Sequence, residues 1–145
     1  MAQNLSWPKT ILVAVDGSDS GYRAADFAIG LATKLGSEVL ILYVIGASSA
    51  DPDYRIPANM VEAFEDMGKE VLGKCEARAK NSGTKFNEIL VTGDPVSEIL
   101  RQAEDKKVDC IVMGKRGLGR LEKLLMGSVS TKVSNLSEIP VILVK

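Results

Sequence analysis

Short runs of consecutive apolar residues recur along the chain, separated by longer amphipathic segments. The first two runs, residues 11–15 and 39–45, contain no charged residue and no alternation with polar residues. A strand that is apolar at every position has both faces buried, which is typical of a parallel sheet covered by helices on each side. Further segments at residues 86–91, 108–113 and 141–144 bring the expected number of strands to five.

Amphipathic segments lie between these runs, so strands and helices are expected to alternate along the chain. The first helix has Ser18 or Asp19 as a candidate N-cap and Gly36 as a C-terminal stop, and the third begins with Asp94 as N-cap and Pro95 at the first helical position. The residues expected to face the core, helix by helix, are Ala25, Ala28, Ile29, Ala32 and Leu35; Met60, Phe64, Met67, Val71, Cys75 and Ala79; Val96, Ile99, Leu100 and Ala103; and Val129, Val133 and Leu136.

This alternation predicts a doubly wound α/β fold with five parallel strands in the order 3-2-1-4-5 and helices on both faces. The strand at residues 86–91 is the most polar, which suits an edge. The second helix is expected over residues 58–81, after a loop at residues 46–57. A length of 145 residues suits one domain, expected over residues 9–145 after a flexible tail at residues 1–8.

The composition excludes several classes of function. The chain has no histidine, which removes the commonest general base and metal ligand. Cys75 and Cys110 have no C-x-x-C spacing and are interpreted as small buried apolar residues rather than a zinc or redox site. A net charge of -1 disfavours nucleic acid and anionic membranes as partners. No apolar run is long enough to span a bilayer, and we expect a cytoplasmic protein.

A glycine-rich segment follows the fourth expected strand and leads to the fourth helix. Its pattern is Gly114-x2-Gly117-x9-Gly127-Ser128, and it matches neither G-x-x-x-x-G-K-[ST] nor G-x-G-x-x-G. Glycines let backbone N–H groups approach an oxygen closely, and a helix N-terminus favours anions. In the predicted topology this segment meets the loop after the first strand at the switch point, where open α/β sheets bind ligands. A phosphate-bearing ligand is therefore expected there.

Three segments together resemble the universal stress protein family, and the likeness extends over nearly the whole chain. They are the glycine pattern above, the sequence VAVDGS at residues 13–18 and the sequence IPV at residues 139–141. The glycine spacing is that of the family's nucleotide-binding branch, whereas another branch lacks it. The resemblance implies bound ATP, or AMP or ADP, with a magnesium or manganese ion held through the phosphates and not by protein ligands.

The resemblance also assigns the candidate site residue by residue. On the adenine and ribose side it implies Ala14, Val15, Asp16, Val44, Met113 and Gly114. Around the phosphates it implies Arg116, Gly117, Gly127, Ser128, Val129 and Ser130. It further implies a homodimer formed through the last strand, Val141–Val144.

Several of these residues have structural alternatives. Asp16 at a strand end could make an Asx turn or cap a helix, and Ser130 could be a cap residue instead of a ligand contact. At the position of Lys115, members of the family frequently have a small residue. The charge of Lys115 either contacts phosphate or faces water. Arg120 and Lys123 add positive charge to the loop, which is favourable for a triphosphate and equally ordinary for a solvated loop.

The expected function is that of an ATP-binding stress-response or regulatory protein in which bound nucleotide biases a dimer or the interaction with an unknown protein partner. No catalytic residue is assigned, so any ATPase activity is expected to be weak or to depend on a partner. Two alternatives remain open: a slow ATP hydrolase or nucleotide-dependent transferase on the same scaffold, and a dimeric scaffold that binds no nucleotide.

Overall fold

The computed structural model describes residues 7–46, 55–116 and 127–145. Most of the expected tail, much of the expected loop at residues 46–57, and the site residue Gly117 lie outside the described residues, as do Arg120 and Lys123. The elements in chain order are β1 (Thr10–Val15), α1 (Asp19–Leu35), β2 (Glu38–Gly46), the 3-10 helix η1 (Ala58–Met60), α2 (Val61–Ser82), β3 (Phe86–Gly93), α3 (Pro95–Asp105), β4 (Cys110–Gly114), α4 (Ser128–Leu136) and β5 (Val141–Val144).

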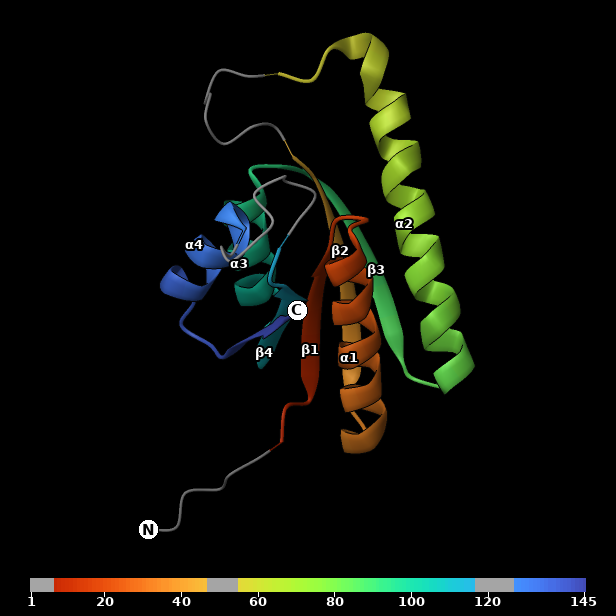
Figure 1. Cartoon of the computed structure of the whole chain (residues 1–145), viewed down its shortest axis with the longest axis vertical. Helices are drawn as coiled ribbons and strands as arrows, with labels where there is room; N and C mark the ends of the chain where they lie inside the picture. The colour runs from red at the N-terminus through yellow and green to blue at the C-terminus, as the bar shows by residue number, and fades with distance from the viewer. Residues whose placement is uncertain (1–6, 47–54, 117–126) are drawn as a thin grey trace.

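The five strands form one sheet in the order β3-β2-β1-β4-β5, and every pairing is parallel. This confirms the predicted fold class and the predicted edge position of β3. Figure 1 shows α1 and α2 on one face of the sheet and α3 and α4 on the other. The strand order changes direction between β1 and β4, so the carboxyl ends of these two strands flank the switch point.

Each face of the sheet has its own apolar core because successive side chains of a strand point to opposite faces. Ile11 and Val13 pack with α1 and α2, whereas Leu12, between them, packs with α3 and α4. Both cysteines are free and buried, and burial raises the pKa of the Cys75 thiol to about 11. The interpretation of Cys75 and Cys110 as core residues is therefore confirmed.

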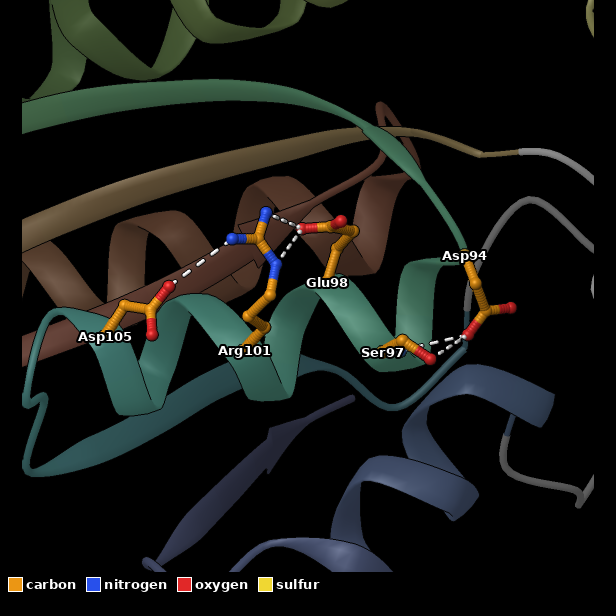
Figure 2. Close-up of polar contacts among 5 residues, drawn as sticks. All are labelled: Asp94, Ser97, Glu98, Arg101 and Asp105. Atoms are coloured by element: carbon orange, nitrogen blue, oxygen red, sulfur yellow. Dashed lines mark hydrogen bonds and ion pairs between the residues drawn. The ribbon is translucent and has the colours of Figure 1, made fainter.

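The helix ends follow the predicted capping residues. Ser18 caps α1 by accepting a hydrogen bond from the Gly21 N–H at 3.1 Å, and Gly36 ends the helix with a φ of 71°. Asp94 caps α3 by accepting hydrogen bonds from the Ser97 N–H at 3.0 Å and the Ser97 hydroxyl at 2.9 Å (Figure 2). Such caps satisfy N–H groups that have no partner inside the helix.

The predicted core stripe of α2 is wrong in its first half. Met60 and Met67 are 43% and 52% exposed, whereas Gly68 and Leu72 are buried. The residue of α2 that faces the sheet here is Gly68. A Cβ atom on Gly68 would lie 2.9 Å from the ring of Tyr43. In Figure 1 the first turns of α2 extend past the carboxyl ends of the strands.

Leu136 of α4 is a second error of the same kind, because it is 62% exposed although the apolar spacing predicted a core position. Val133, one turn earlier, is fully buried against the sheet. Leu136 is the last residue of the helix, where the chain leaves this face for β5. No helix among the described residues is long and apolar enough to cross a membrane.

Candidate functional site

The turn after β1 is held by the Asp16 carboxylate. Its Oδ1 accepts hydrogen bonds from the Ser18 N–H at 3.0 Å and from the Ser18 hydroxyl at 2.5 Å, which forms an Asx turn. Gly17 between them has a φ of 86°, a left-handed conformation that favours glycine. The structural alternative for Asp16 is thus present in the fold. The other carboxylate oxygen, Oδ2, has no hydrogen-bond partner among the described residues.

The glycine-rich segment is closed at its base by hydrogen bonds between its two ends. The Lys115 carbonyl accepts the Gly127 N–H at 2.8 Å and the Ser130 hydroxyl at 2.8 Å. The Lys115 N–H donates to the Val144 carbonyl of β5 at 2.7 Å. These contacts bring the end of β4, the start of α4 and the end of β5 together.

Ser130 is buried in this closure, with 2% of its surface exposed. A hydroxyl group has a single hydrogen to donate, and the acceptors beside it are the carbonyls of Lys115 and Gly127. Its side chain therefore ties the loop to α4. Any hydrogen bond that Ser130 donates to a ligand is left to its backbone N–H, at the third position of the helix.

The first turn of α4 presents unpaired donors. Gly127 is the N-cap, with extended backbone angles of φ −61° and ψ 155° and no side chain to cap the helix. The backbone N–H groups of Ser128 and Val129 have no hydrogen-bond partner in the part of the chain that the structure describes. Together with the positive end of the helix dipole, these groups favour an anion.

The first turn of α1 reaches the same loop from the opposite face of the sheet. The Ser20 hydroxyl donates a hydrogen bond to the carbonyl of Arg116, whose side chain is exposed. Gly114 lies directly against this turn: a Cβ atom there would be 2.8 Å from the Ser20 carbonyl carbon and 3.0 Å from the Gly21 nitrogen. Gly114 therefore permits the close approach of β4 to α1, a reason that the sequence analysis did not identify.

The residues assigned to the adenine side lie at the same edge. Ala14 pairs with Met113 across β1 and β4 in register, and Val44 is one residue beyond Tyr43, the partner of Val15. Ala14 and Val44 are half-buried, whereas Val15 and Met113 are buried. The structure thus gathers the described candidate residues at the carboxyl ends of β1, β2 and β4 and the start of α4.

The sequence analysis missed two residues beside this edge. Burial raises the pKa of the Tyr43 hydroxyl, and the negative charge of Asp16 raises it further, so the phenol stays neutral near the carboxylate. Tyr43 had one signal in the sequence, as the single aromatic residue of its strand. Ser20 had none, because its acceptor is 96 residues away along the chain.

Comparison with known proteins identifies the family. The model of the universal stress protein family matches residues 8–145. The chain belongs to the universal stress protein family. Among its relatives, universal stress protein YxiE of Bacillus subtilis is 35% identical, over 93% of this chain and 97% of the relative.

Solved structures of universal stress proteins share the fold. UspA from Lactobacillus plantarum superposes with a TM-score of 0.84 at 24% identity, over 98% of this chain and 100% of that one. A universal stress protein solved in complex with cAMP has a TM-score of 0.70 at 30% identity, over 97% and 98% of the two chains. The family membership that the sequence motifs predicted is thus confirmed, and so is the fold.

Proposed function

We propose that this universal stress protein binds an adenine nucleotide at the carboxyl ends of β1 and β4. The observation that carries the proposal is the meeting of two structures at the switch point of the sheet. One is the Asp16 turn and the other is the α4 N-terminus, and within residues 7–46, 55–116 and 127–145 neither Oδ2 of Asp16 nor the N–H groups of Ser128 and Val129 have a hydrogen-bond partner. The first suits ribose hydroxyls and the second suits phosphate oxygens.

The related structure in complex with cAMP supports an adenine nucleotide over other phosphate ligands. In the proposed arrangement Ala14, Val15 and Val44 border the base and Asp16, Met113 and Gly114 the ribose. The phosphates lie against the residues already assigned to them: Arg116, Gly117, Gly127, Ser128, Val129 and Ser130. Lys115 and Arg116 add positive charge at the base of the loop.

A divalent ion would be held through the nucleotide in this proposal. Among the described residues no group of three or more Asp, Glu, Cys or His side chains is placed to bind a metal. Phosphate oxygens and water are ligands that Mg²⁺ prefers, and they require few protein ligands. ATP with Mg²⁺ or Mn²⁺ is therefore the form of ligand that we propose.

The bound nucleotide acts as a regulator in this proposal, working in the cytoplasm through a homodimer or a protein partner. The Lys115–Val144 hydrogen bond joins the base of the glycine loop to β5, the strand that we propose as the dimer edge. In this proposal, a structural change around the phosphates reaches β5 through this hydrogen bond. Slow ATP hydrolysis is the second candidate, and it predicts product formation over many turnovers at catalytic protein concentrations.

Thermal unfolding of the full chain with ATP, AMP and GTP, each with and without Mg²⁺, tests the proposal. ATP at about 100 times its dissociation constant should stabilise the protein by ~2.7 kcal/mol, which raises Tm by several degrees. GTP should shift Tm less than ATP because the proposed contacts favour adenine. If none of the nucleotides raises Tm, the binding proposal is wrong and the nucleotide-free scaffold is favoured.

A further inference from the structure

Ser20 makes the contact that joins α1 to the base of the glycine loop. Its side chain is buried, with 7% exposed, and its hydroxyl donates to the carbonyl of Arg116. A serine in a helix often donates instead to the carbonyl four residues earlier in its own chain segment. Here the Ser20 hydroxyl instead donates outside its own helix, to Arg116 in the connection between β4 and α4.

The loop base is therefore held from both faces of the sheet. On the α4 face, the Lys115 carbonyl accepts from Gly127 and Ser130, each at 2.8 Å. On the α1 face, the next carbonyl along the chain, that of Arg116, accepts from Ser20. Two successive carbonyl groups are thus held from opposite faces of the sheet, which fixes the backbone at Lys115 and Arg116.

The contact leaves little room for adjustment. Gly114 packs on the backbone of Ser20 and Gly21, where an added Cβ atom would come within 3.0 Å of both residues. Gly21 is equally confined, because a Cβ atom there would lie 2.8 Å from Oδ1 of Asp16. The turn that holds Asp16, the first turn of α1 and the end of β4 are therefore one packed unit, with the Ser20 hydroxyl at its boundary with the loop.

We propose that Ser20 is a positioning residue for the phosphate end of the nucleotide site: its hydrogen bond to the Arg116 carbonyl fixes the peptide group next to the Lys115 carbonyl, which holds Gly127 and Ser130 at the start of α4. This inference rests on the nucleotide binding proposed above. Ser20 is not assigned a ligand contact, since its single hydroxyl hydrogen is used by Arg116. Asp16 on the ribose side is held by its own hydrogen bonds to Ser18, so loss of the Ser20 bond should affect phosphate recognition most.

The test is calorimetric titration of the full chain with Mg²⁺-ATP, AMP and adenosine. The variants are Ser20→Ala, which removes the donor, and Ser20→Thr, which keeps it. Losing one hydrogen bond should raise the ATP dissociation constant about three- to tenfold. The increase should be smaller for AMP and absent for adenosine, and Ser20→Thr should bind ATP as the wild type does. Ser20→Cys, close in shape but with a weak donor, repeats the measurement if Ser20→Ala folds poorly.

A matched control is Thr33→Ala in the last turn of the same helix, which removes a hydroxyl bonded to the Ile29 carbonyl at 2.7 Å and to the Thr84 hydroxyl at 2.6 Å. It should leave all three dissociation constants unchanged. Equal weakening of all three ligands by Ser20→Ala, or an unchanged ATP constant, overturns the positioning role. Failure of the wild type to bind any of the ligands instead overturns the nucleotide proposal itself, so the two failures are distinguishable.

Discussion

Gly114 of β4 packs so closely on Ser20 of α1 that a Cβ atom at Gly114 would lie 2.8 Å from the Ser20 carbonyl carbon. We predict that Gly114→Ala lowers the free energy of unfolding by about 1–3 kcal/mol, the usual cost of overpacking. Gly30→Ala is the matched control because a Cβ atom there meets nothing within 4 Å. It should raise stability by up to about 1 kcal/mol through helix propensity. Urea unfolding measures both, and similar effects of the two variants would contradict the packing account.

The polar groups of α3 shown in Figure 2 differ in their expected contributions to stability. Asp94→Ala removes the N-cap and should cost about 1 kcal/mol in the free energy of unfolding. Arg101→Ala breaks ion pairs with Glu98 at 2.6 Å and Asp105 at 3.3 Å, but the Arg101 side chain is 54% exposed. Its removal should change stability by less than about 0.5 kcal/mol. Chemical denaturation of both variants should therefore find the cap to be worth more than the two ion pairs.

Two carboxyl groups, Glu88 of β3 and Glu76 of α2, lie close together on the α2 side of the sheet. Burial raises the pKa of Glu88, and its interactions with Glu76 raise it further, while Lys80 lowers it slightly. An acid whose pKa is raised on folding stabilises the protein when protonated, and this contribution is lost as pH rises through the folded pKa. Glu88→Gln should therefore increase stability at pH 7, by about 0.5 kcal/mol at this solvent-screened position.

The gain from Glu88→Gln should disappear on acidification, once Glu88 is protonated in the wild type as well. Urea unfolding across the range from pH 7 to below the ordinary pKa of a glutamate measures this. Glu70→Gln is the control, because Glu70 is exposed and its ion pair in the described part of the chain is with Lys74, at 3.6 Å. It should show no gain at pH 7. A gain for Glu88→Gln that persists at low pH would contradict the electrostatic explanation.

The fold was predictable because its signals are local. Unbroken apolar runs such as residues 11–15 predict two-sided burial, and Ser18 and Asp94 are capping residues at the points where helices begin. The errors came where apolar spacing continues beyond the sheet. Met67 fits an apolar spacing as Cys75 does, but its neighbour Gly68 is the residue that faces the sheet, and Met67 is exposed. Periodicity indicates which face of a helix is apolar, and it does not indicate where the opposing layer ends.

The candidate site was predictable to the level of the segments that form it, but not to the level of the role of each side chain. Spacing marked Gly114 and Ser130 as site residues, whereas the structure gives each a packing or hydrogen-bonding partner within the protein: Gly114 against α1, and Ser130 on the Lys115 carbonyl. Ser20 was missed because its partner is distant in sequence and serine occurs at many helix starts. Such contacts depend on tertiary packing, which no local pattern encodes.

The phosphate assignment depends most on the start of α4, where Gly127 precedes the unpaired N–H groups. Gly127→Val places a branched side chain at this position. Its backbone angles, φ −61° and ψ 155°, are ones that valine adopts readily, so the fold should be retained. The variant therefore separates ligand binding from folding, and urea unfolding without nucleotide verifies that the fold is intact.

Calorimetric titration of the wild type and of Gly127→Val with Mg²⁺-ATP measures whether the phosphates bind at the start of α4. The account predicts saturable binding at about one ATP per chain for the wild type. It predicts that binding is lost, or weakened at least about a hundredfold, in the variant, because ~3 kcal/mol of phosphate contacts cannot form. Equal ATP affinity for the two folded proteins, or no heat of binding for the wild type, would contradict it.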